Sequence, residues 1–155
     1  MQIKPFFDQD TATFSYIIID EESKNCAIID SVLDYNIHSG STSTESAERI
    51  IDYITKNDLK TEWIIETHIH ADHLTAASYL KEKLGGKIAI GANVVKILPF
   101  WTALFNSEND TPLDGSQFDH LFQDEEIFQI GNLSVKTFYT PGHTPSCSSY
   151  LVEDS

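Results

Sequence analysis

Four side chains that can bind a metal lie within one short segment, His68-Ile69-His70-Ala71-Asp72-His73. In an extended loop His68 and His70 point to the same side, because alternate side chains share a face. Asp72 and His73 stand where the chain is predicted to turn into a helix, so they can approach from another side. Imidazole and carboxylate groups suit zinc, iron and manganese. The segment therefore predicts a metal site, for one ion or for two.

The alternative for this segment is a solvated polar loop in which Asp72 is the N-cap of the following helix. Three of the six histidines of the chain gather here, directly after a predicted buried strand, and this concentration favours the metal site.

A second motif, Thr140-Pro141-Gly142-His143-Thr144-Pro145, follows another predicted strand. Two prolines and a glycine restrict the backbone around His143, so a ligand held there would have little freedom left to lose on binding. Alone, this motif would be interpreted as a simple turn. Beside the first motif, His143 becomes the candidate for a third histidine ligand.

The elements that must position these motifs follow from hydrophobic periodicity and turn residues. Strands are predicted at 11–19, 26–29, 63–66, 87–90, 126–130, 133–140 and 147–152. Helices are predicted from a capping box at Thr42-x-x-Glu45 to about Asn57, over 74–84, and as a turn over 92–98 that ends before Pro99. Residues 100–121 are predicted to be irregular. Strands, then strand–helix units, then a hairpin indicate helices packed on a mixed sheet.

Composition excludes several classes of partner. Lys and Arg total 10 against 24 Asp and Glu, a net charge of −14, which disfavours nucleic acid and anionic membranes. No segment has the pattern of a signal peptide or a membrane span. Cys26 and Cys147 are too few for a disulfide framework and are expected to be reduced in a cytoplasmic protein. A homo-oligomer is left open by the composition.

Together the two motifs resemble those of the metallo-β-lactamase superfamily, in which His-x-His-x-Asp-His is followed later by Pro-Gly-His-Thr-Pro. Ile28-Ile29-Asp30, at the end of the first predicted hairpin, also matches, with Asp30 at the superfamily's early acidic position. The segments 66–76 and 34–40 are most similar to persulfide dioxygenases and β-lactamase-hydrolase-like proteins. The resemblance covers nearly the whole chain and implies an α/β fold, the four-layered αββα sandwich.

The resemblance also implies roles for the individual residues. His68, His70 and His143 would face one ion, and Asp72 and His73 a second ion, as in glyoxalase II. In a persulfide dioxygenase, His68 and His143 would instead hold a single iron together with one carboxylate. His70, Asp72 and His73 would then orient the ligands and bound water, which makes Asp72 the candidate catalytic residue.

The leading function implied by the resemblance is a persulfide dioxygenase that uses Fe²⁺ and O₂ to oxidise glutathione persulfide, a small thiol-derived substrate, to sulfite. The first alternative is a thioester hydrolase of the glyoxalase II type, in which two zinc ions lower the pKa of a bridging water and polarise the carbonyl. The second alternative is a non-catalytic metal-binding remnant.

The superfamily pattern continues with a further strand that ends in a metal-binding Asp, and its hydrolases have a last His still later. This chain ends at Glu153-Asp154-Ser155, where that strand would be approached, and Asp154 is not expected to be the missing ligand. We therefore expect residues 1–155 to form one domain, the N-terminal portion of the sandwich, with the fold incomplete at its C-terminus.

Overall fold

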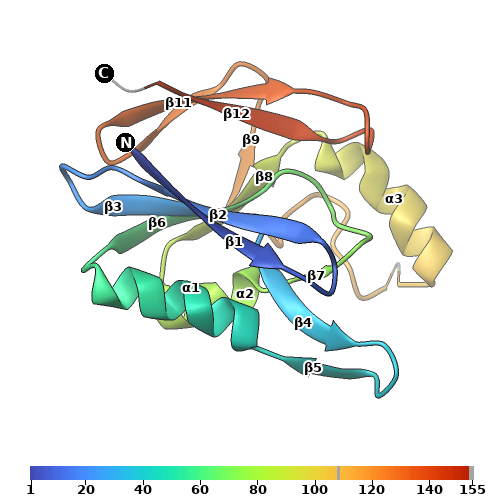
Figure 1. Ribbon diagram of the computed structural model, residues 1–155. Helices are drawn as coiled ribbons and strands as arrows, with labels where there is room; N and C mark the ends of the chain where they lie inside the picture. Colours follow the sequence, from blue (N-terminus) through green and yellow to red (C-terminus); the bar gives the residue numbers. More distant parts are fainter. Residues whose placement is uncertain (108, 154–155) are drawn as a thin grey trace.

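The structure, a computed structural model, describes residues 1–107 and 109–153 and has three layers (Figure 1). A six-stranded sheet is the middle layer, with helices α1 and α2 on one face and a three-stranded sheet on the other. The strands of the large sheet, in spatial order, are β1 (Gln2–Asp8), β2 (Thr13–Ile19), β3 (Asn25–Ile29), β6 (Lys60–Glu66), β8 (Lys87–Gly91) and β9 (His120–Phe122). β1, β2 and β3 are antiparallel neighbours, whereas β3, β6, β8 and β9 run parallel.

The isoleucine run of β2 shows how the middle sheet packs against the layers on both of its faces. Ile17 and Ile19 face the helices, whereas Ile18 faces the small sheet, because alternate side chains of a strand point to opposite faces. Ile28 of β3 and Ile64 of β6 join the helix-side core. A sheet covered on both faces needs such continuous apolar runs, and this is what the sequence provides.

The small sheet consists of β10 (Ile127–Ile130), β11 (Leu133–Tyr139) and β12 (Ser148–Glu153), all antiparallel. The turn between β10 and β11 places Gly131 at a φ of 58°, which glycine adopts without strain. Leu133, Val135 and Thr137 are buried, because alternate side chains of β11 point to the same face.

Three helices and a second small sheet complete the fold. The helices are α1 (Glu45–Lys56), α2 (Ala77–Leu84) and α3 (Val94–Phe105), and a second small sheet has the order β5 (Ser41–Ser43), β4 (Val32–Asn36), β7 (Leu74–Thr75). The helix predicted over 74–84 therefore begins three residues late. Leu74 and Thr75 pair with Leu33 and Val32 of β4 instead.

Helix α1 is confirmed, but the predicted capping box is wrong. Thr42 lies in β5, and Thr44, the residue before the helix, makes no side-chain cap. The cap comes from Asp34 of β4, whose carboxylate accepts hydrogen bonds from the Ser46 N–H at 2.9 Å and the Ser46 hydroxyl at 2.5 Å. A carboxylate from another strand satisfies the free N–H group that a local Ser or Thr usually satisfies.

Helix α3 corrects two further predictions, since it continues through Pro99 and takes in the first part of the segment expected to be irregular. Pro99 removes one helical hydrogen bond. The helix is retained because buried residues lie before the proline (Val94 and Leu98) and after it (Thr102). The helix ends at Asn106, which adopts the left-handed conformation.

Both cysteines are free, Cys26 in the core and Cys147 half-buried. Burial raises the pKa of the Cys26 thiol to about 11. No helix in the described part of the chain is long and apolar enough to cross a membrane.

Candidate metal centre

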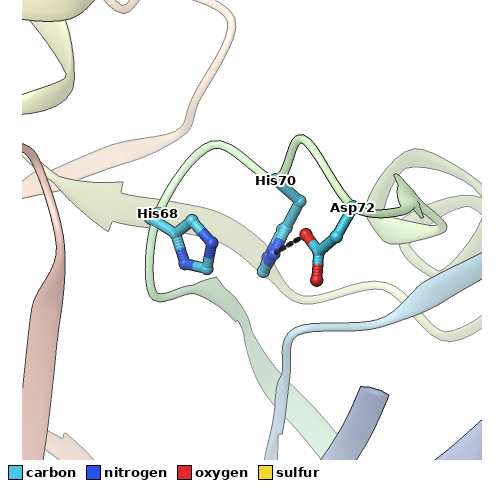
Figure 2. A group of neighbouring side chains, drawn as sticks. All are labelled: His68, His70 and Asp72. Carbon is cyan, nitrogen blue, oxygen red and sulfur yellow. Dashed lines mark ion pairs between the residues drawn. The ribbon is translucent and has the colours of Figure 1, made fainter. Parts of the chain in front are cut away.

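The metal-binding candidates gather where the parallel strands end. Asp30 directly follows β3, and the loop from Thr67 to His73 follows β6, the neighbouring parallel strand. Carboxyl ends of adjacent parallel strands meet at one edge of a sheet, which is where open α/β sheets bind ligands. Figure 2 shows His68, His70 and Asp72 along this loop, with His68 and Asp72 on either side of the His70 ring.

Three of the predicted ligands converge on one point. His68, His70 and Asp72 each offer a ligand atom within 4.8 Å of the others. The rings of His68 and His70 have centroids 4.1 Å apart, and His70 Nδ1 lies 3.8 Å from Asp72 Oδ1. His73 stacks on the other side of His70, with ring centroids 4.1 Å apart. The arrangement gathers imidazole nitrogen and carboxylate oxygen in one small volume.

Thr67 determines which nitrogen of His68 is free. The Thr67 hydroxyl donates its single hydrogen to Asp30 Oδ2 at 2.8 Å. The same oxygen lies 2.9 Å from His68 Nδ1 and can only accept there, so His68 Nδ1 carries the hydrogen. Neutral His68 therefore presents an unprotonated Nε2, and this atom is buried without a hydrogen-bond partner among the described residues.

Two carboxylates determine the tautomer of His70 in the same way. His70 Nε2 lies 2.9 Å from Glu66 Oε2 and 3.1 Å from Asp30 Oδ1, so it is the nitrogen that carries a hydrogen. Its Nδ1 is then the atom left for a ligand, and among the described residues it is buried without a hydrogen-bond partner, with Asp72 Oδ1 at 3.8 Å.

His73 completes the pattern. Its Nδ1 lies 3.0 Å from the carbonyl oxygen of Leu74, which can only accept a hydrogen bond, so Nδ1 donates. His73 Nε2 is left buried, again with no partner among the residues described. Leaving a buried polar atom unpaired normally costs about 1–3 kcal/mol, and three such atoms in adjacent imidazoles need an explanation.

A bound metal ion explains the pattern. Imidazoles that bind metals place one nitrogen on the ion while a carboxylate, a carbonyl or another polar group holds the second. His68, His70 and His73 each have one ring nitrogen held in this manner and the other free. The free nitrogens of His68 and His70 and the Asp72 carboxylate are a donor set suited to zinc, iron or manganese, with the His73 nitrogen beside them.

Protonation of the site depends on the two buried carboxylates. Burial would lower the pKa of His70, but hydrogen bonds to Asp30 and Glu66 outweigh it and raise that pKa to about 10. Burial likewise acts to raise the pKa of Asp30, and the hydrogen bonds from His70 and Thr67 reverse this and lower it. Burial raises the pKa of Glu66. Without a bound ion, His70 is therefore the group of the site that is protonated most readily, and its positive charge stabilises the two carboxylates.

His143 reaches the site from the other sheet. Its loop joins β11 to β12, and its ring lies perpendicular to that of His68, with centroids 4.9 Å apart. The side chain is exposed. The structure thus brings His143 beside His68, whereas its role as a ligand stays a prediction.

Sequence reasoning assigned Glu66 no role, although it is central to the site. Glu66 is buried, and besides His70 it accepts a hydrogen bond from the Thr75 hydroxyl at 2.5 Å. A carboxylate at the end of an apolar strand was the available signal, because Glu is almost never fully buried unless it is paired. Of the two histidines outside both motifs, His38 lies exposed. His120 is half-buried on β9, with its Nε2 2.6 Å from Glu126 Oε1.

The histidines that carry these nitrogens line a cavity of about 680 Å³. His68, His70, Asp72 and His73 lie along it, and β4, β7 and α3 supply apolar walls. A volume of this size accommodates a small-molecule substrate.

Residues 10–155 match the sequence profile of the Metallo-beta-lactamase superfamily. The chain belongs to this superfamily. It is 49% identical over 154 residues to glyoxylase B2 of Dictyostelium discoideum, a match that covers 99% of this chain and 53% of that protein. It is 26% identical over 152 residues to the human mitochondrial persulfide dioxygenase ETHE1, a match that covers 98% of this chain and 48% of that protein.

The crystal structure of ETHE1 from Myxococcus xanthus matches with a TM-score of 0.72 at 26% identity, covering 98% of this chain and 54% of that one. The prediction of a metallo-β-lactamase fold is thereby confirmed. The chain spans about half the length of the curated relatives it matches. The described residues supply three layers, and Asp154, expected not to be a ligand, lies outside them.

Proposed function

We propose that this chain provides the metal site of an enzyme that oxidises a low-molecular-weight persulfide with O₂. The observation that carries the proposal is the set of buried, unpaired nitrogens of His68, His70 and His73 beside Asp72, all bordering one apolar cavity. The likeness to persulfide dioxygenase ETHE1 supports this choice of chemistry within the superfamily.

His68 and His143 are the residues proposed to hold the ion, with a carboxylate as the third ligand. Iron bound in this way would offer neighbouring coordination positions to a persulfide sulfur and to O₂. His70, fixed by Asp30 and Glu66 through its Nε2, would direct its Nδ1 at this group and orient it. The apolar walls of the cavity would exclude water from the reacting sulfur.

The proposed reaction balances with one water. Glutathione persulfide, the first substrate to test, reacts with O₂ and H₂O to give glutathione, sulfite and two protons. The terminal sulfur is oxidised, O₂ is reduced, and the sulfur–sulfur bond breaks.

The test is oxygen uptake by the iron-loaded chain with glutathione persulfide, together with sulfite formation. We expect uptake that His68→Ala abolishes, whereas His38→Ala, which changes an exposed histidine, leaves it unchanged. Bound iron without oxygen uptake, alongside rapid hydrolysis of S-lactoylglutathione, would reverse the assignment.

Thioester hydrolysis of the glyoxalase II type is the second candidate, and His73 is the observation that favours it. Its buried, unpaired Nε2 stands beside the His68, His70 and Asp72 group, where a second ion would need a ligand. The 49% identity to glyoxylase B2 points in the same direction. Two zinc ions per chain, reduced to one by His73→Ala, would support the hydrolase. One iron per chain, unchanged by that substitution, would support the dioxygenase.

A further inference from the structure

The cavity beside the metal site has two apolar walls. Leu33 and Tyr35 of β4 line one side, and Trp101 and Phe105 of α3 line another, with Leu74 of β7 also facing the space. Figure 1 shows the β4–β5 hairpin and α3 projecting at the same end of the molecule. Segments far apart in the sequence thus build an apolar chamber next to the free nitrogens.

Apart from the histidines of the metal site, the described residues of the cavity offer no positive side chain to receive an anionic substrate. Among the described residues, none that lines it is Lys or Arg. Its carboxylates are already engaged, because Glu66 accepts hydrogen bonds from Thr75 and His70, and Asp72 faces the histidine cluster that would hold a cation. The net charge of −14 for the chain disfavours anions further.

Large apolar side chains are left in water at the mouth of this cavity. Phe105 is 71% exposed and Tyr35 is 50% exposed, although both line the cavity, and Leu74 is exposed as well. The Trp101 and Phe105 rings lie nearly parallel, 12° apart, with centroids at 5.9 Å. Exposed apolar groups that converge on a concavity are typical of a binding site for an apolar ligand.

We propose that the group attached to the reacting sulfur of the substrate is neutral and apolar, an alkyl or aryl chain that lies between Tyr35 and the Trp101–Phe105 pair. The assignment of a reacting sulfur rests on the proposed function, whereas the affinity of the cavity for an apolar chain does not. Glutathione, which carries two carboxylates, has no cationic partner on these walls and is disfavoured by them.

The test measures binding of ethanethiol, butanethiol, hexanethiol and glutathione to the zinc-loaded chain by calorimetry. We expect affinity to rise about three- to fourfold per methylene from ethanethiol to hexanethiol, as burial of each methylene predicts. Glutathione should bind at least tenfold more weakly than hexanethiol. Trp101→Ala and Phe105→Ala should weaken hexanethiol by about tenfold and ethanethiol very little, with zinc content unchanged.

Leu104→Ala is the matched control, because Leu104 is 60% exposed on the same helix and does not line the cavity. Equal affinities for ethanethiol and hexanethiol, tighter binding of glutathione, or a preference for the cationic thiol cysteamine would each overturn the proposal. If affinity rises with the length of the alkyl thiol but no persulfide supports oxygen uptake, only the proposed function is refuted. Turnover of glutathione persulfide in preference to hexyl persulfide would refute only this inference.

Discussion

Asp30 shows how a single residue beside the candidate ligands organises the site. Its carboxylate accepts hydrogen bonds from the Thr67 N–H at 2.7 Å and from the Thr67 hydroxyl, and it also holds His70 Nε2. Its backbone has a φ of 49°, in the left-handed region that Asp tolerates better than most residues. One side chain thus fixes both the loop after β6 and the tautomer of a candidate ligand.

Asp30→Asn tests this positioning role. The amide keeps the size of the side chain but removes one acceptor and the negative charge, so His70 loses part of its orientation. We expect zinc affinity to fall about 10- to 100-fold, measured by competition with a chromophoric chelator. Asp52→Asn, on the exposed side of α1, should leave the affinity unchanged. Equal affinities for both variants would show that Asp30 only stabilises the fold.

The raised pKa of His70 predicts how metal binding depends on pH. Below a pKa of about 10, His70 without a metal is protonated, whereas an ion needs the lone pair on Nδ1. Binding must therefore release about one proton from this group, and affinity should increase as pH rises toward 10. Calorimetry of zinc binding in two buffers with different ionisation enthalpies measures the protons released. If the unchanged chain releases no more protons on zinc binding than the His70→Ala variant does, the prediction is contradicted.

The residues of the site divide according to how far their roles depend on the fold. His68, His70, Asp72 and His73 could be predicted because their spacing alone places metal-binding groups in one loop. Glu66 was missed, because its place after an apolar strand indicated burial but not its partners, and Thr75 approaches it only when β7 pairs with β4. The sequence shows which groups can bind a metal, and the tertiary contacts determine which atoms are left free to do so.

At the scale of elements, periodicity predicted α1 and the positions of β2, β3, β6 and β8, but local rules failed at the helix ends. The capping box at Thr42 was a sound local interpretation that β4 overrides, since Asp34 reaches Ser46 from a separate strand. Pro99 was expected to end α3, yet burial of Leu98 and Thr102 holds the helix together through it. Both errors arose where packing outweighs a local preference.

Asp34→Ala should reveal the true cap of α1. Loss of the carboxylate leaves the Ser46 N–H and hydroxyl without their acceptor, so the free energy of unfolding should fall by about 1–2 kcal/mol. Thr42→Ala is the matched comparison and should change it by less than about 0.5 kcal/mol. Urea unfolding of both variants makes the measurement. If Thr42→Ala lowers the free energy of unfolding more than Asp34→Ala does, the capping box at Thr42 is the true cap.

At the scale of the whole molecule, the two sheets do not close completely on each other. A groove of about 360 Å³ lies between them, lined by Ile3 of β1 and Ile18 of β2 on one side and by Tyr150 and Val152 of β12 on the other. Within the described residues, β1 and β12 are each at the edge of their sheets, so backbone groups left unpaired there accompany this apolar surface. Exposed strand edges beside apolar side chains favour pairing with another chain.

We therefore expect the 155-residue chain to associate with itself through this groove. Burial of an apolar side chain is worth about 1.5–3 kcal/mol, so a few groove residues can drive association at micromolar concentrations. Sedimentation should show a mass that rises with concentration, and Ile3→Lys should shift that rise to at least tenfold higher concentration. Ile37→Lys, at an exposed position outside the groove, should leave it in place. A chain that stays monomeric at every concentration and unfolds cooperatively would show that the groove is stable in water and is no interface.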